Sequence, residues 1–466
     1  MKTLQSSWRL FFNPVIIGLF LVIDLPCYTA AQSPGNSTAK YQAEPPVNGE
    51  LIRESRARQD LLDSRSPAEL RVVQITTNPA VASHNIYTEI QVFTPDSRRF
   101  VFLRQRDFWL CDTEDGFSLR RLTDERGAQA PSVSPDGRWM YYFVNTTTTT
   151  GGALILKRVS LENFERQTVL KIDGPLLGTQ YRPNGPTTLS SISSDGKRLC
   201  IASFIGDGET VNAPFGLLVY DLEKPSVKLI FKDQGFHNAH PQYCRSTDPV
   251  LSHDIMIQNN HGDSLLANGR SVRSVSGREG DLHIIRDDGT NWRDIPVGRD
   301  SVQFIQGHEQ WRGRTGSVLS AMSIRRGERA GYRPVFLAWP VRTDIYSAHQ
   351  GVNIPGGSYV DITRNLANPD LWHFSSDLSG KYLVSDTQTR VAGRERLDIR
   401  LVLGTMSEGD EPELKLQHLI VTGSSGRNPA HPHPFFSPDN RMIFFNSDVD
   451  GIVQIFMLTG YSFPQD

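Results

Sequence analysis

The sequence predicts an all-β fold, built as one seven-bladed β-propeller in a single domain. Short strands with alternating apolar residues recur from about residue 70 to the end of the chain, and polar turns separate them. One turn motif returns at nearly regular intervals, which indicates a repeat architecture. The 38 glycines and 28 prolines fit a chain that contains many turns.

The first 31 residues are expected to be a secretory signal peptide. Lys2 and Arg9 give a positive start, and residues 15–23 form an apolar run far shorter than the ~20 residues that span a bilayer. Ala30 and Ala31 then supply a small-residue cleavage site. We therefore expect a secreted or periplasmic protein without a stable membrane span, with an uncleaved anchor as the alternative.

The remaining chain divides by composition into two parts. Residues 32–69 are expected to be a flexible N-terminal lead, because residues 32–53 are rich in serine, proline and asparagine. Residues 70–466 are expected to form the propeller, which would be the catalytic domain. Within it, residues 70–93 are expected to supply strand material that closes the ring.

The repeated turn resembles Ser-Pro-Asp-Gly. Its proline presets φ at the first central position, and the following Asp and Gly tolerate a left-handed backbone. The clear copies carry Asp96, Asp136, Asp195 and Asp439, and the weaker copies lie at residues 243–248, 311–316 and 377–380. Seven copies about 57 residues apart suit four-stranded blades with insertions. An open sandwich or a six-bladed ring is the alternative, because the copy at 311–316 is weak.

Charge and cysteine content exclude several classes of protein. With 49 Lys and Arg against 51 Asp and Glu, the chain lacks the basic surplus of a general nucleic-acid binder. After cleavage of the signal, three cysteines remain at positions 111, 200 and 244, and these allow at most one disulfide. We expect them to be small buried apolar residues on strands.

Histidines gather at one position of the repeat. Five of the twelve precede the aspartate position of a turn by six or eight residues: His240, His308, His373, His431 and His433. Such positions lie just ahead of the innermost strand of each blade, so side chains about sixty residues apart can meet at one end of the channel. Imidazole is a common ligand of transition metals. A lone histidine is more often structural, but the shared register favours a metal site.

Three segments resemble a known family. His240-Pro241-Gln242-Tyr243 is one, and the segment 288–291 leading to His308-Glu309-Gln310-Trp311 is another. The third is His431-Pro432-His433-Pro434 with the following turn. In this order, over residues 75–460, they are similar to the oligogalacturonate lyases of polysaccharide lyase family 22. The resemblance implies a seven-bladed propeller that cleaves short galacturonate chains by β-elimination with bound manganese or another divalent transition metal.

The resemblance also implies roles for single residues. His308, His431 and His433 match metal ligands of the family, and His240 matches its Brønsted base. Asn428 occupies the position of the family's fourth ligand, a glutamine. The strand before His240 lacks the family's active-site arginine.

The implied reaction sets clear chemical requirements. The base removes the proton beside the uronate carboxylate, and a divalent cation on that carboxylate stabilises the negative charge that develops. A neutral histidine that is not a metal ligand suits the base at neutral pH. Arginines that flank the histidine motifs are candidates for binding further carboxylates of an acidic oligosaccharide: Arg245, Arg312, Arg314 and Arg427.

Two other functions remain open from the sequence. The first is a non-catalytic propeller similar to periplasmic translocation proteins, which would bind a protein partner and no metal. The second is the propeller part of a serine peptidase. That class is disfavoured because no Gly-x-Ser-x-Gly motif follows the last repeat.

Overall fold

The computed structural model describes residues 42–47, 49, 51–148, 152–234, 236–260, 264–273, 280–299, 302–340, 357–389 and 398–465. The expected signal peptide, residues 1–31, lies outside these ranges. The described residues form strands and two short 3-10 turns, η1 (Gln59–Leu61) and η2 (Leu251–His253), and contain no α-helix. Accordingly, no described helix has the length and apolar character of a membrane span.

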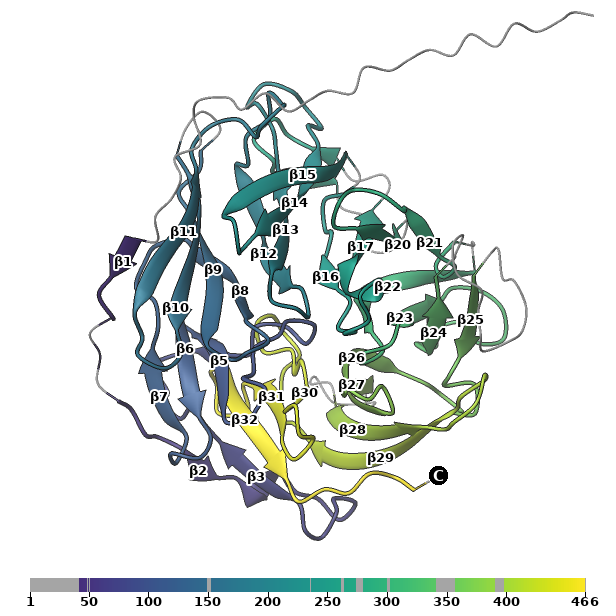
Figure 1. The fold of residues 1–466 in the computed structure, drawn as a ribbon. Helices are drawn as coiled ribbons and strands as arrows, with labels where there is room; N and C mark the ends of the chain where they lie inside the picture. The colour runs from purple at the N-terminus through teal and green to yellow at the C-terminus, as the bar shows by residue number, and fades with distance from the viewer. Residues whose placement is uncertain are drawn as a thin grey trace, which may run out of the picture. The chain divides into compact units, whose positions relative to one another are not determined.

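Seven antiparallel sheets are arranged around a centre, which confirms the predicted seven-bladed propeller (Figure 1). Blade 1 contains β4 (Ser83–His84), β5 (Arg99–Arg104), β6 (Asp107–Asp112) and β7 (Ser118–Arg121). Blade 2 contains β8 (Ala128–Val133), β9 (Trp139–Asn145), β10 (Leu154–Ser160), β11 (Arg166–Ile172) and, at its edge, β1 (Gln42–Glu44). Blade 3 contains β12 (Gly185–Ile192), β13 (Arg198–Phe204), β14 (Phe215–Asp221) and β15 (Ser226–Asp233).

The chain continues around the ring in order. Blade 4 contains β16 (Gln242–Tyr243), β17 (Asp254–Asn260), β20 (Gly280–Arg286) and β21 (Arg293–Ile295), with an inserted hairpin of β18 (Ser264–Leu265) and β19 (Ser271–Arg273). Blade 5 contains β22 (Gln303–Trp311), β23 (Val318–Ile324), β24 (Val335–Trp339) and β25 (Ser358–Asp361). Blade 6 contains β26 (Leu371–Ser376), β27 (Tyr382–Thr389), β28 (Asp398–Met406) and β29 (Leu414–Val421). Blade 7 contains β30 (Phe435–Phe436), β31 (Ile443–Ser447), β32 (Gln454–Thr459), β3 (Arg71–Gln74) and β2 (Arg56–Ala57).

The ring is closed by strands from both ends of the propeller. β3 precedes blade 1 in sequence but pairs antiparallel with β32 of blade 7, from Arg71 opposite Thr459 to Gln74 opposite Phe456. This pairing confirms that the segment after residue 70 supplies the closing strand. The last blade thereby gains its outer strands, and its two faces pack on blades 6 and 1.

Part of the segment expected to be a flexible lead is instead paired with the blades. β1 extends the sheet of blade 2 by pairing with β11, and β2 extends blade 7 by pairing with β3. Ile52 forms a further bridge with Leu119. The difference arises because the outermost strand of a blade leaves an open edge, and a polar chain with few apolar residues can still satisfy that edge with backbone hydrogen bonds.

The apolar core lies between the blades. Seven clusters of buried residues each combine side chains of two neighbouring blades, so that every blade packs on both faces. The cluster between blades 7 and 1, for example, contains Phe444 and Phe100, whose ring centres are 4.6 Å apart. Cys111, Cys200 and Cys244 are buried and free, as the sequence predicts.

One backbone hydrogen bond defines the turn after each innermost strand. In every blade a residue that we call the turn cap donates its N–H to a carbonyl at the start of the second strand. The turn caps are Thr94, Ser134, Ser193, Cys244, Arg312, Asp377 and Ser437. In the Ser-Pro-Asp-Gly copies, the hydroxyl of the turn cap also bonds to the Asp, as Ser134 Oγ does to Asp136 Oδ1 at 2.5 Å. All three weak copies contain the backbone hydrogen bond of the turn cap, which explains why they fold as blades.

The innermost strand of blade 1 is interrupted by an excursion of the chain. β4 pairs with β5 only through Ser83 and His84, and the pairing resumes at Phe93 opposite Phe100. Residues 85–91, here called the crossing segment, instead reach residues of other blades. The Tyr87 ring, for example, contacts His240 of blade 4 and His433 of blade 7. The crossing segment therefore traverses the central channel.

We predict that the ion pairs at the ring closure contribute more to stability than exposed pairs elsewhere. Arg58 has a side chain only 8% exposed and donates to Asp450 Oδ2 at 2.7 Å, which joins the chain before β3 to the turn before β32. Asp450→Ala removes this bond and the one from Arg56, while Arg58 keeps its bonds to Asp60 and Gln74, so the free energy of unfolding should fall by about 1.5–3 kcal/mol.

The matched control is Asp115→Ala, which removes an exposed ion pair with Arg53. Urea unfolding should register a change of about 0–1 kcal/mol for this variant. Equal losses in the two variants would contradict the role given to Arg58 and Asp450.

Candidate active site

Four consecutive blades place a histidine at the same position of the innermost strand. His240, His308, His373 and His433 each lie four residues before the turn cap of their blade. When residues are counted from the aspartate position of the turn, His240 lies eight residues before it and the other three lie six before it. The hydrogen bond from Cys244 N–H to the Asp254 carbonyl brings it into line, because the turn of blade 4 is longer. Blades 4 to 7 therefore gather their histidines on one side of the channel.

Three imidazoles lie close enough together to share a cation. The ring nitrogens of His373, His431 and His433 that could serve as ligands all lie within 4.8 Å of one another. The ring centres of His373 and His431 are 4.9 Å apart, and those of His373 and His433 are 4.4 Å apart. His308 lies against this group, with its ring centre 4.3 Å from that of His373.

Asp386 fixes the orientation of His373. Its carboxylate lies 3.1 Å from Nδ1 of His373 and accepts a hydrogen bond from the backbone N–H of the same residue at 2.7 Å. Both side chains are buried, with exposed fractions of 3% and 0%. A carboxylate on one ring nitrogen directs the other nitrogen away from it, which is the usual support of a metal-bound histidine.

The electrostatics of the group also fit a cation site. Burial first, and then the charge of neighbouring imidazoles, lower the pKa of His431 and hold the pKa of His433 well below its usual value. Both rings are therefore neutral at neutral pH, as metal ligands must be. Neutral imidazoles with one carboxylate behind them match the donors that Mn²⁺, Zn²⁺ and similar ions accept.

A second group of charges surrounds His240. Its Nδ1 lies 3.3 Å from Glu89 Oε1 of the crossing segment and 3.7 Å from Glu309 Oε1. Burial alone would lower the pKa of His240, but the charges of the two carboxylates and the bond to Glu89 outweigh it and raise the pKa to about 9. Because Glu89 is the larger of these influences, His240 is held as a buried imidazolium at neutral pH, paired mainly with Glu89.

Several polar atoms of this second group lack hydrogen-bond partners. Among the described residues, neither carboxylate oxygen of Glu309 is hydrogen-bonded, and Glu89 Oε1 has only its contact with His240. Nδ1 of His308 is buried without a partner as well. Buried polar atoms are rarely left unpaired in folded proteins. Their concentration beside the histidines therefore indicates a place where water or a ligand binds.

Tyr87 connects the two groups. Its ring centre lies 5.6 Å from that of His240 and 4.8 Å from that of His433, and its hydroxyl lies 3.4 Å from the carbonyl of Gly307. One aromatic side chain thus lies between the His240 imidazolium and the group of His373, His431 and His433.

His240 and His433 share an unusual backbone conformation. Their φ angles are 42° and 43°, and each precedes a proline. Ala130 of blade 2 stands at the same position with φ 50°, also before a proline. The left-handed conformation is therefore a property of the repeat, and these two blades present a histidine on it.

The structure brings together some of the site residues predicted from the sequence and separates others. His308, His431 and His433 lie in one cluster, with His240 across Tyr87. Asn428 is exposed in the loop before them, so its role as a fourth ligand stays a prediction.

The four predicted arginines are spread over different places. Arg312 donates to the Gly380 carbonyl at 2.7 Å and so belongs to the turns, while Arg427 is exposed in the loop of Asn428. Arg245 and Arg314 instead line a cavity formed by the turns.

Other residues of the site carried no assigned role in the sequence prediction. His373 stood in the histidine register but received no function there. No sequence motif contains Asp386, Tyr87 or Glu89. They contact the histidines only because the ring folds. Glu309 directly follows His308, and that adjacency was the one signal that pointed to it.

We predict that Asp386 sets the affinity of the cation site. Asp386→Asn removes the charge behind His373, so the affinity for Mn²⁺ measured by calorimetry should fall by about 10–100-fold. Asp410→Asn, an exposed position of the same blade, should bind Mn²⁺ as the unchanged protein does. Tight binding by both variants would rule out the proposed support of His373.

We also predict that His240 stays charged across the neutral range. Because its folded-state pKa is raised above the usual ~6.5, the imidazolium should persist until the pH rises through about 9. Glu89→Gln removes the larger of the two opposing charges and should lower this pKa by about 1–3 pH units. NMR titration of the ring nitrogens follows both changes. An imidazole that titrates near its usual value in the unchanged protein would refute the prediction.

Comparisons with known proteins agree with the seven-bladed fold. No protein-family model matches the chain. An oligogalacturonide lyase of Pectobacterium atrosepticum is 23% identical over 400 residues, which covers 82% of this chain and 90% of that protein. The crystal structure of an oligogalacturonate lyase from Vibrio parahaemolyticus has a TM-score of 0.63 at 16% identity, covering 89% of this chain and 98% of that one.

A second solved structure, an oligogalacturonate lyase in complex with manganese, has a TM-score of 0.62 at 18% identity. It covers 91% of this chain and 99% of the other. The chain thus resembles the oligogalacturonate lyases over most of its length, in sequence and in its seven-bladed fold.

Proposed function

We propose that the protein is a metal-dependent lyase that cleaves short galacturonate chains by β-elimination. One observation carries the proposal: three imidazoles close enough to hold a cation lie beside a fourth, neutral imidazole and a buried imidazolium. Because the chain is similar to an oligogalacturonide lyase, uronate elimination is the reaction that these histidines suit best.

Elimination from a uronate requires three things of a site. The carboxylate must be bound by positive charge, because its own charge makes the neighbouring C5 proton hard to remove. A neutral base must take that proton as the electron pair forms the C4–C5 double bond. The leaving oxygen on C4 must then receive a proton.

His373, His431 and His433 are the residues that would hold the metal. When bound, the metal would supply the positive charge that makes the C5 proton more acidic. This assignment adds His373 to the family pattern and removes His308 from it. It rests on the 4.8 Å grouping and on the support that Asp386 gives to His373.

His308 is the proposed base in place of His240. Burial and the neighbouring His373 keep the pKa of His308 well below its usual value, so the ring is neutral and can accept a proton. Its Nδ1 has no hydrogen-bond partner among the described residues. A ring that stands beside the metal ligands without belonging to their group is suitably placed for the C5 proton.

His240 is proposed to bind charge or to donate a proton. A base must be unprotonated when substrate binds, and the carboxylate of Glu89 opposes that state. An imidazolium can instead neutralise a uronate carboxylate or protonate the leaving oxygen. This role would compensate for the arginine that the strand before His240 lacks.

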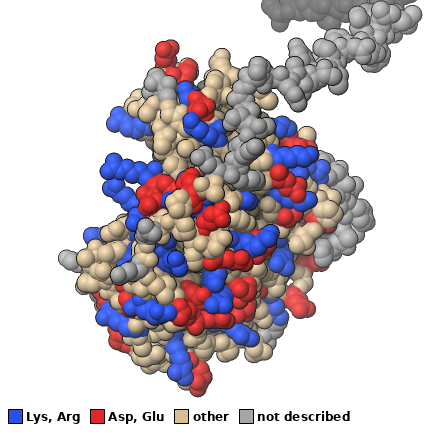
Figure 2. Space-filling model, turned by 60° about the vertical axis from the view of Figure 1, so that its left-hand side comes forward, with Lys and Arg blue, Asp and Glu red and all other residues tan. Residues whose placement is uncertain are grey.

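Affinity for an acidic sugar would depend on these local charges. The protein carries a net charge of −2, and Figure 2 shows acidic and basic side chains intermingled on the visible face. No long-range field would draw in an anion. We also propose that the reaction takes place outside the cytoplasm, on the basis of the signal expected in residues 1–31.

We predict that trigalacturonate incubated with the protein and Mn²⁺ will yield an unsaturated product, detected by the ultraviolet absorbance of its conjugated double bond. His308→Ala should lower kcat by about 10²–10⁴-fold, because it removes the base. It should retain Mn²⁺, because the three ligands remain.

His240→Gln tests the exchange of roles between the two histidines. It should raise KM more than it lowers kcat, because it removes a cation that binds the substrate. A loss of Mn²⁺ from His308→Ala would restore the ligand set predicted from the sequence. A kcat loss in His240→Gln without a change in KM would return the role of base to His240. An absence of both product and bound metal in the unchanged protein would favour the non-catalytic propeller.

A further inference from the structure

The mouth of the channel on the side of the turns forms a separate cavity of about 250 Å³. Every blade contributes a residue of its turn to the lining: Pro95, Pro135, Ser194, Thr247, Arg314, Leu378 and Pro438. The site histidines lie four residues before the turn caps, which corresponds to about 13 Å along a strand. The cavity therefore lies further along the innermost strands, toward the turns, than the histidine cluster.

The crossing segment separates the cavity from the histidine cluster. Its residues alternate in direction, as in a strand. Tyr87 and Glu89 contact the histidines, whereas Thr88 and Ile90 line the cavity. A ligand of the cavity would thus lie on the far side of the crossing segment from the metal ligands.

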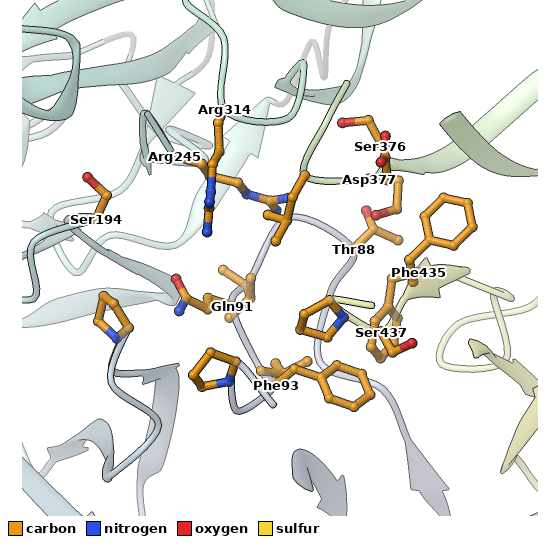
Figure 3. A pocket seen from close by; sticks show the side chains of 18 of the residues that line it. Thr88, Gln91, Phe93, Ser194, Arg245, Arg314, Ser376, Asp377, Phe435 and Ser437 are labelled. Carbon is orange, nitrogen blue, oxygen red and sulfur yellow. The ribbon is translucent and has the colours of Figure 1, made fainter. Parts of the chain in front are cut away.

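Two arginines provide the charge of the cavity. Arg245 is partly buried, and its one hydrogen bond to the described residues goes from Nη2 to the backbone carbonyl of Glu89 at 3.1 Å. The guanidinium of Arg314 makes no hydrogen bond or ion pair with the described residues. In Figure 3, both side chains extend into the cavity from the same side. A guanidinium with open donors is suited to a planar anion.

The one carboxylate of the lining does not neutralise them. Oδ2 of Asp377 accepts from Ser379 and from Asn440, and Oδ1 accepts from the backbone N–H of Tyr382. These bonds hold Asp377 within the turn of its blade. The cavity therefore retains an excess of positive charge without a bonded counter-charge among the described residues.

The opposite wall is apolar. Phe93 and Phe435 line it together with Val92 and the prolines of the turns. Figure 3 shows Phe93 and Phe435 across the cavity from Arg245 and Arg314. A hydrated inorganic ion would leave this wall uncovered, whereas a molecule with an apolar face would cover it.

We propose that this cavity is a second binding site, for a compact carboxylate with an apolar or ring-shaped body. The carboxylate pairs with Arg245 and Arg314, and the body packs on Phe93 and Phe435. The volume is below the ~300–1,000 Å³ of pockets for drug-sized ligands, so the ligand is a single ring and not an oligosaccharide. The proposal does not depend on lyase activity.

The test uses benzoate as the probe. Benzoate combines a carboxylate with one apolar ring, benzyl alcohol is its neutral match, and inorganic phosphate is an anion without an apolar body. Calorimetry with the full chain should detect benzoate, with benzyl alcohol and phosphate each binding at least tenfold more weakly. Hydrogen exchange should then slow in peptides that cover residues 244–248 and 312–316.

Arg314→Ala is the decisive variant, because Arg314 is exposed and its side chain supports no other residue. It should weaken benzoate binding by about tenfold or more, and Arg314→Lys should recover part of the loss. Arg326→Ala removes another exposed arginine of the same blade and should bind benzoate normally.

Three results would overturn the proposal. The first is equal benzoate affinity in Arg314→Ala and in the unchanged protein. The second is slowed exchange confined to residues 427–434, which would place the ligand at the histidines. The third is phosphate affinity equal to that of benzoate, which would leave the apolar wall without a role.

Discussion

Closure of the ring is the constraint on which the site depends. β3 pairs with β32, and this pairing holds the first and last blades together. Seven interblade cores then fix the rotation of each blade against the next. The position four residues before each turn cap is thereby brought to one end of the channel in every blade. Histidines at that position in four consecutive blades meet because of this geometry, and no single blade could form the site.

The channel is divided into two ends with different chemistry. On one side, clustered imidazoles form the proposed site for a metal ion and a base. On the other side, two guanidiniums face an apolar wall. Glu89 of the crossing segment touches both, since its carboxylate contacts His240 and its carbonyl accepts from Arg245. Gln242 adds a further link by donating to Glu89 Oε2 and to the Glu309 carbonyl, both at 2.7 Å.

The sequence was sufficient to predict the architecture, because short local patterns, the turn motif and the alternating strands, specify the blades. The turn chemistry around Asp136 and Asp439 reveals the blades, and their spacing gives the number of blades. Weak copies such as the one that contains Arg314 could be identified by spacing alone, since a backbone hydrogen bond defines the turn and tolerates other side chains. The strands before residue 70 were missed because edge pairing needs few apolar residues.

The site was only partly predictable. The histidine register follows from the repeat, so His308, His431 and His433 were found together. The charge of His240 could not be inferred, because Glu89 approaches it from blade 1, about 150 residues away in the sequence. The same holds for Asp386, which supports His373 from the neighbouring strand. Motif similarity assigned the ligands by spacing, whereas the proposed set follows the three imidazoles whose ring nitrogens lie within 4.8 Å of one another in the folded ring.

Anomalous X-ray diffraction from crystals grown with Mn²⁺ would test the central claim most directly. The account predicts one strong anomalous peak within coordination distance of ring nitrogens of His373, His431 and His433, with His308 and His240 outside the ligand sphere. A peak bound to His308 in place of His373, or no peak near these histidines, would contradict it.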